Sequence, residues 1–178
     1  LIQFNLLTIL LGMGSMFLAF SYPFMKRITY WPQLFLGLTF NWGIIMAWTA
    51  INNNISIEII ILYISAIFWT LGYDTIYGAQ DMSDDEIIGL KSTAIKFKNN
   101  IKLFLSFVYL ITIFLIVYLL RDQINLSITL FLFFLFIISL VYQIFNFEKF
   151  NKKKYLNLFK LNNLSGFIMF LTFISINY

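Results

Sequence analysis

Five of the chain's eight acidic residues lie in the stretch GYDTIYGAQDMSDDEIIGLKSTAIKFKNN, at positions 72–100. If a helix continues through it, a rotation of about 100° per residue places Asp81 and Asp85 within about 20° of Asp74 on one face. Asp81 and Asp85 would then be about 6 Å apart along the axis. Aligned like charges destabilise a helix unless something neutralises them. We therefore expect a cation at this face.

The missing residue types limit which cation this is. The chain has no cysteine and no histidine, which excludes thiolate metal sites, disulfides, His-ligated haem and Ser-His-Asp or Cys-His catalysis. Any bound metal must be held by oxygen ligands, which suit Mg²⁺, Ca²⁺ or Mn²⁺.

The neutralising charge could also come from the lysines of IGLKSTAIKFK, which follow the acids directly. Gly89 is expected to interrupt or cap the helix, and GLKST offers a cation and two hydroxyls where phosphate oxygens could bind. The segment lacks the first glycine of a nucleotide-binding P-loop. A plainer alternative is a solvated loop whose acids offset nearby lysines.

The elements that position these residues are membrane-spanning helices. The chain is 61% hydrophobic and only 11% charged, well below the roughly 25% charged residues of a soluble domain. Its apolar runs are continuous, which favours an all-α polytopic bundle over a β-barrel. We expect one domain over 1–178, and because the chain starts at Leu1 we expect it to lack an N-terminal part. Six spans are predicted at about 1–21, 33–51, 55–72, 101–120, 126–146 and 162–177.

The basic residues predict the orientation of these spans. Eleven of the twelve Lys and Arg residues lie in segments 22–32, 73–102 and 147–161. The opposite loops hold only Arg121. Because Lys and Arg accumulate in cytoplasmic loops, these three segments are predicted to be cytoplasmic, with both ends of the chain outside. The net charge of +4 then reflects topology and not a nucleic-acid partner, although EKFNKKKY could bind anionic head groups.

Two longer motifs are more specific. YPFMKRITYWPQLFLGLTFNWGIIMAW and GYDTIYGAQDMSDDEIIGLKSTAIKF resemble the UbiA family of membrane prenyltransferases, most closely the branch that prenylates 4-hydroxybenzoate. The resemblance implies a nine-helix bundle with its active site at the cytoplasmic face. In that site two Asp-rich motifs bind the Mg²⁺ ions that hold a polyprenyl diphosphate. The six predicted spans would be the last six of the nine.

The resemblance also implies roles for individual residues. Asp81 and Asp85 form the second motif, DxxxD, and are the expected metal ligands. Lys91 and Arg27 are expected to contact phosphate or a substrate carboxylate. Further candidates around the substrate are Asp74, Asp84, Lys26 and Tyr77. An allylic cation also needs an electron-rich wall, for which Trp31, Trp42, Trp48, Trp69, Tyr73 and Tyr77 are available.

The family's first motif, of the type NDxxDxxxD, is absent from these 178 residues. We therefore expect this chain alone to be inactive, unless an N-terminal companion chain supplies that motif. The expected reaction is transfer of a polyprenyl group to 4-hydroxybenzoate in ubiquinone biosynthesis, at a bacterial inner membrane more than a mitochondrial one. Alternatives are another aromatic or quinone-precursor acceptor, a non-catalytic or split-gene fragment, and a transporter in which Asp74 and Asp81 carry protons or cations.

Overall fold

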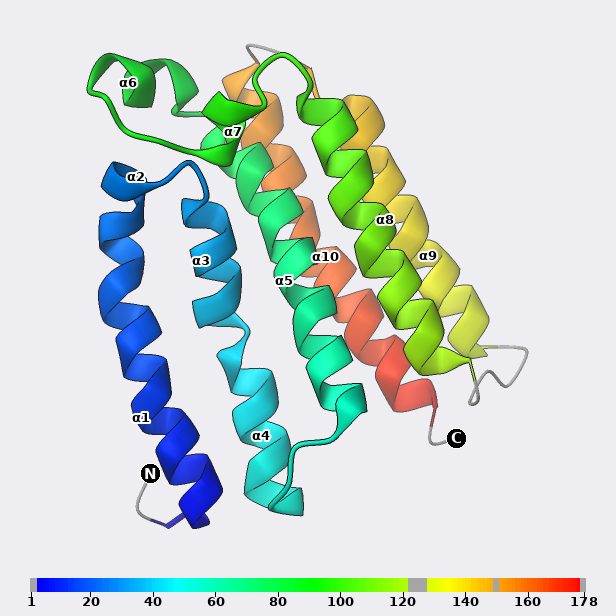
Figure 1. The fold of residues 1–178 in the computed structure, drawn as a ribbon. Helices are drawn as coiled ribbons and strands as arrows, with labels where there is room; N and C mark the ends of the chain where they lie inside the picture. The colour runs from blue at the N-terminus through cyan, green and yellow to red at the C-terminus, as the bar shows by residue number, and fades with distance from the viewer. Residues whose placement is uncertain (1–2, 122–127, 149–150, 177–178) are drawn as a thin grey trace.

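The chain folds into helices that run back and forth between two ends of the molecule (Figure 1). The computed structural model describes residues 3–121, 128–148 and 151–176. Among these residues, six helical segments are long and apolar enough to cross a membrane, which confirms the all-α polytopic bundle. The elements are α1 (Leu6–Ser21), η1 (Tyr22–Phe24), α2 (Met25–Ile28), α3 (Pro32–Phe40), α4 (Trp42–Asn52), α5 (Ile57–Gly78), α6 (Met82–Ile87), α7 (Thr93–Lys96), α8 (Ile101–Leu120), α9 (Ile128–Asn146) and α10 (Lys152–Ser175).

Several helices extend beyond the predicted apolar spans. The last helix begins at Lys152 and not near residue 162, and α5 continues to Gly78. The Asn151 side chain caps α10 by accepting a hydrogen bond from the Lys154 N–H at 3.2 Å. Hydropathy marks the part of a helix that lies in lipid, so it misses charged turns that continue the helix into water.

The second membrane crossing is an interrupted helix. Between α3 and α4, the Asn41 side chain donates hydrogen bonds to the Gly37 carbonyl at 2.9 Å and to the Thr70 hydroxyl at 2.8 Å. Polar groups inside a bilayer need internal partners because no water is available there. The Asn41 side chain therefore caps the carbonyl at the end of α3 and links α3 to α5. Such helix-to-helix hydrogen bonds are typical of asparagine in a membrane bundle.

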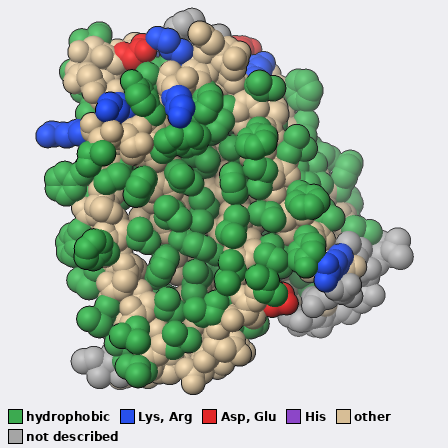
Figure 2. Space-filling model, in the orientation of Figure 1, with side chains coloured by type: hydrophobic (Ala, Val, Ile, Leu, Met, Phe, Trp, Pro, Cys, Tyr) green, Lys and Arg blue, Asp and Glu red, His purple; other side chains and the backbone are tan. Residues whose placement is uncertain are grey.

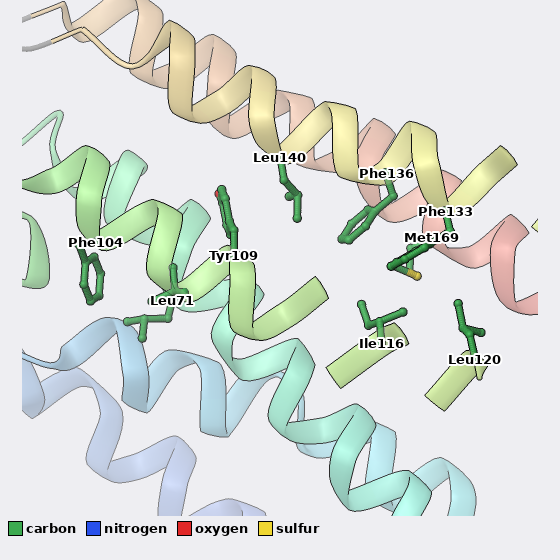
Figure 3. Close-up of a cluster of buried hydrophobic side chains, with 10 residues drawn as sticks. Leu71, Phe104, Tyr109, Ile116, Leu120, Phe133, Phe136, Leu140 and Met169 are labelled. Carbon is green, nitrogen blue, oxygen red and sulfur yellow. The ribbon is translucent and has the colours of Figure 1, made fainter. Parts of the chain in front are cut away.

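The core forms where α5 and α8 pack together and meet α9 and α10 (Figure 3). Gly72 of α5 faces Tyr109 of α8, and a Cβ at Gly72 would lie only 2.1 Å from the tyrosine ring. The missing side chain is therefore what lets the two helices approach so closely. Leu71, Phe136 and Leu140 complete the centre of this cluster, each at most 2% exposed.

A polar network crosses the same core. The Tyr109 hydroxyl donates to Gln143 Oε1 at 2.6 Å. Gln143 Nε2 and Trp69 Nε1 both donate to Asn162 Oδ1, at 3.3 and 3.2 Å. These four side chains come from α8, α9, α5 and α10 in turn. Hydrogen bonds between membrane helices stabilise a bundle by roughly 0.6–2 kcal/mol each, so the network fixes the last three crossings against α5.

The segments between crossings sort to the two ends as the lysine distribution predicts. η1, α2, the segment between α5 and α8, and the start of α10 all lie at one end of the bundle (Figure 1). Figure 2 shows basic side chains gathered at this end, above a face covered by hydrophobic side chains. The candidate functional residues lie at this basic end.

Candidate functional site

The acidic residues of the α5–α8 connection, defined as residues 79–100, do not continue the helix of α5. That helix ends at Gly78, and α6 begins at Met82 with Asp81 as its N-cap. The predicted single helix through residues 74–85 is therefore wrong, and Asp74 lies on a different helix from Asp85. Asp81 and Asp85 are still one helical turn apart, as predicted, because the Asp85 N–H donates to the Asp81 carbonyl at 2.8 Å.

Gly89 ends α6 as predicted. Its φ of +75° is a left-handed conformation that glycine adopts at little cost. The following Leu90 N–H turns back to the Asp85 carbonyl at 2.8 Å. The chain therefore reverses after α6 and returns toward the bundle.

The carboxylate of Asp85 points toward α2 and meets a lysine there. Asp85 Oδ2 lies 3.3 Å from Lys26 Nζ, and the Asp85 side chain is only 10% exposed. A carboxylate at such depth needs a charge partner, and removing one partner of a buried pair is costly. The structure thus brings together Lys26 and Asp85, two residues that are 59 positions apart in the sequence.

Lys91 reinforces the same junction. Its backbone N–H donates to the Lys26 carbonyl at 2.8 Å. Its side-chain Nζ donates to the Ile28 carbonyl at 3.1 Å and lies 5.6 Å from the centre of the Tyr30 ring. Lys91 therefore holds the connection against α2 through both its backbone and its side chain.

The two hydroxyls of GLKST are turned inward. The Ser92 hydroxyl caps α7 by accepting from the Ile95 N–H at 3.2 Å. The Thr93 hydroxyl is hydrogen-bonded to the Thr75 hydroxyl at 2.6 Å, and the Thr93 N–H donates to Gln33 Oε1 at 3.0 Å. These groups anchor the connection to α3 and α5. The expectation that both hydroxyls are available to phosphate is wrong, because both are buried.

The remaining charged candidates are spread over the outside of the connection. Asp84 is 69% exposed on its side chain and pairs with Lys152 of α10 at 3.3 Å. Arg27 is exposed and takes part in none of the ion pairs found among the described residues. On the neighbouring segment, a hydrogen bond from Lys154 lowers the pKa of Glu148.

Two oxygen acceptors at the start of α6 have no protein partner among the described residues. The Asp81 side chain is partly exposed and makes no capping hydrogen bond to α6. Gln80, directly before it, has a buried Oε1 without a hydrogen-bond partner. Sequence reasoning missed Gln80, and its only signal was its place directly before the DxxxD motif. Each of these oxygens is an acceptor that a cation or a water molecule could satisfy.

The donor set fits Mg²⁺ in part. No group of three or more His, Cys, Asp or Glu side chains is arranged around a common point in the described part of the chain. Mg²⁺ is, however, usually held by one or two carboxylates, waters and substrate phosphates, not by an all-protein cage. Asp81 and Asp85, one helical turn apart in the chain, could supply the two carboxylates of that partial set.

An aromatic surface follows α5 toward the connection. Trp69, Tyr73 and Tyr77 are spaced four residues apart, which places them along one side of the helix. The Trp69 and Tyr73 rings meet edge to face with centroids 6.1 Å apart. Phe159 of α10, which the sequence did not single out, lies 5.9 Å from Tyr73 and 4.7 Å from Tyr77. We call these four side chains the aromatic wall.

Trp31, Trp42 and Trp48 lie elsewhere. Trp42 donates a hydrogen bond to the Leu11 carbonyl at 3.0 Å, and Trp48 donates to Asn54 at 3.1 Å. Both therefore serve the contacts around α4 and not the aromatic wall. Trp31 packs against Phe97 and Phe104 at the start of α8.

Comparisons with known proteins match the sequence to a family. The model of the UbiA prenyltransferase family matches residues 1–173. Over 107 residues, or 60% of this chain, it is 52% identical to the mitochondrial 4-hydroxybenzoate polyprenyltransferase of Arabidopsis thaliana and 53% identical to that of Homo sapiens. The matched stretch is only 26% and 29% of the length of these relatives. No solved structure matches significantly. Because the family model covers nearly all of the sequence, the chain belongs to the UbiA prenyltransferase family.

Proposed function

We propose that the protein transfers a polyprenyl group from polyprenyl diphosphate to the ring of 4-hydroxybenzoate, a step of ubiquinone biosynthesis. The observation that carries the proposal is the ion pair of Lys26 with Asp85 of the DxxxD motif, in the connection that follows α5 and its aromatic residues. Relatives that are about half identical to this chain over 60% of its length carry the name of that enzyme. Membership in a prenyltransferase family sets aside the transporter alternative.

In this proposal the acidic residues bind the metal ion of the diphosphate and the basic residues contact its oxygens. Asp81 and Asp85 would hold Mg²⁺, which when bound would offset the charge that grows on the leaving diphosphate. Lys26 leaves Asp85 for the incoming phosphate oxygens, so the lysine gains an anionic partner and the carboxylate becomes free. Lys91 lies beside them, and the exposed Arg27 is suited to bidentate contact with phosphate or with the benzoate carboxylate.

The chemical step is an exchange of bonds at the allylic carbon. The C–O bond breaks and its electron pair leaves with the diphosphate, while a ring carbon of the acceptor forms the new C–C bond and then loses its proton. The positive charge that develops on the allyl group is stabilised by aromatic faces. The aromatic wall supplies such faces on the side of α5 that contacts α10.

The proposal includes a second source of metal ligands. Mg²⁺ needs more oxygen ligands than Asp81 and Asp85 would supply, so a further Asp-rich motif, on a companion chain or on additional helices, would complete the site. We place the protein in a bacterial inner membrane with the connection facing the cytoplasm. The names of its relatives are mitochondrial, so fractionation of the source cells decides between the two membranes.

The direct test is transfer of a radiolabelled prenyl group to 4-hydroxybenzoate in membranes that contain this chain. It is run with Mg²⁺ or with EDTA, and with or without co-expressed helices carrying the first Asp-rich motif. We expect Mg²⁺-dependent product only on co-expression. Product from other aromatic acceptors alone would move the protein to another branch of the family. No product with both parts folded and inserted would contradict the proposal.

A further inference from the structure

A hollow lies at the basic end, lined by none of the residues of the junction or of the aromatic wall. It forms where the segment before α3 meets α7 and the start of α8, and its volume is about 510 Å³. That lies within the roughly 300–1,000 Å³ typical of small-ligand sites. Its lining residues are Trp31, Phe97, Asn100, Leu103, Phe104 and Phe107.

The wall of this hollow is built from aromatic rings that hold one another. Phe97 and Phe104 are stacked with centroids 4.1 Å apart and an interplanar angle of 9°. Trp31 contacts both rings edge to face, at 5.8 and 6.1 Å. Such contacts restrict ring rotation, so the hollow keeps its shape without a ligand.

The hollow opens on the outer surface of the bundle. Leu103 and Phe107, on the first two turns of α8, are 71% and 60% exposed. Because α8 is long and apolar enough to cross a membrane, these side chains face lipid. Five of the six lining residues are apolar, and the sixth, Asn100, stands at the end of the helix that faces water.

A lysine stands at the polar edge of the hollow. Lys96 Nζ lies 4.4 Å from the centre of the Trp31 ring. Among the described residues, Lys96 forms no ion pair, and no carboxylate lines the hollow. Its neighbours are engaged: Lys98 pairs with Glu86 at 2.6 Å, and Lys102 donates to the Phe145 carbonyl at 3.2 Å. Lys96 is therefore a cation above an apolar groove at the membrane boundary.

We propose that this hollow binds an anionic phospholipid. One acyl chain lies along Leu103, Phe104 and Phe107, and the phosphate lies at Lys96 and Asn100. The apolar lining selects a chain, and the lysine selects a negatively charged head group over a zwitterionic one. A water-soluble anion would leave the exposed apolar lining uncovered, and a neutral lipid would leave the lysine without an anionic partner.

Lipids with brominated acyl chains test the proposal, because bromine quenches tryptophan fluorescence at close range and Trp31 lines the hollow. The full chain is placed in vesicles containing brominated phosphatidylglycerol or brominated phosphatidylcholine at equal mole fraction. The Trp31 signal is the difference between the unaltered chain and Trp31→Phe. We expect roughly a fivefold preference for the anionic lipid at this tryptophan, the effect of one lysine at a membrane surface.

Matched variants separate a specific site from ordinary surrounding lipid. Lys96→Gln should abolish the preference, and Lys96→Arg should keep it. Lys98→Gln is the control, because that lysine is equally exposed but already paired with Glu86. If Trp31→Phe does not fold, the Phe107→Trp variant, which keeps Trp31, is used instead. Its added quenching relative to the unaltered chain reports on another lining position of the hollow. Equal quenching by both lipids, or a preference that survives Lys96→Gln, would overturn the proposal.

Discussion

The ammonium of Lys26 and the carboxylate of Asp85 form an ion pair that joins α2 to α6 at 3.3 Å. The pair holds the α5–α8 connection against α2 in the absence of substrate. It also keeps the DxxxD motif from presenting two unscreened carboxylates. In the proposed reaction, the diphosphate would become the partner of Lys26, and Asp85 would become free to hold Mg²⁺.

Removing the Asp85 carboxylate should affect both folding and turnover. Asp85→Ala leaves Lys26 without its partner, and we expect a loss of roughly 1–3 kcal/mol in stability with a fall in turnover of at least about 100-fold. Thermal unfolding in detergent and prenyl transfer in the completed enzyme measure the two effects. Asp84→Ala, whose ion pair with Lys152 is largely exposed, should change stability by less than about 1 kcal/mol.

Asp81 should behave differently, because its carboxylate makes no capping bond. Asp81→Ala should leave the unfolding temperature nearly unchanged while turnover falls by at least about 100-fold. If Asp81→Ala kept near-normal activity, the metal role would have to move to Asp74 or Asp84.

Gln80 offers a finer test of the metal site. Replacing a buried acceptor that has no partner is neutral or stabilising, so Gln80→Leu should not lower the unfolding temperature. If its Oε1 binds Mg²⁺ or a Mg²⁺-bound water, the Mg²⁺ concentration for half-maximal activity should rise by about tenfold. An unchanged Mg²⁺ dependence would show that Gln80 takes no part in the site.

The contact between Gly72 and Tyr109 predicts a purely structural effect. A Cβ at Gly72 would collide with the Tyr109 ring, so Gly72→Ala should cost about 1–3 kcal/mol of stability through overpacking. Gly43→Ala is the matched control, because a Cβ at Gly43 has no atom within 4 Å. Equal unfolding temperatures for the two variants would mean that α5 and α8 can move apart without cost.

Composition and lysine placement were sufficient to predict the helical bundle, its six crossings and the end at which the candidate site lies. The left-handed turn at Gly89 was also predictable, because few other residues adopt that conformation readily. These features depend on residue type and on the difference between lipid-facing and water-facing segments, and both can be read directly from the sequence.

The break between α5 and α6 was not predictable from periodicity. The sequence GAQD contains no proline, so the helical pattern of Asp74, Asp81 and Asp85 continued through it. The bend depends on tertiary contacts, chiefly Thr93 with Thr75 and Gln33 and Asp85 with Lys26. For the same reason the sequence ranked Arg27 above Lys26. Neighbouring cations on a short helix look alike until the fold shows which one meets a carboxylate.

The hydrogen bonds of Asn162 also bear on the order in which the membrane inserts this chain. Trp69 and Gln143 enter the bilayer on α5 and α9, yet both donate to an oxygen on α10, which is synthesised after them. Until α10 arrives, these donors are exposed to hydrocarbon or borrow temporary partners. Insertion of α10 therefore supplies the partner of both donors, and a nascent chain stalled before α10 is the form that membrane quality-control proteases should recognise.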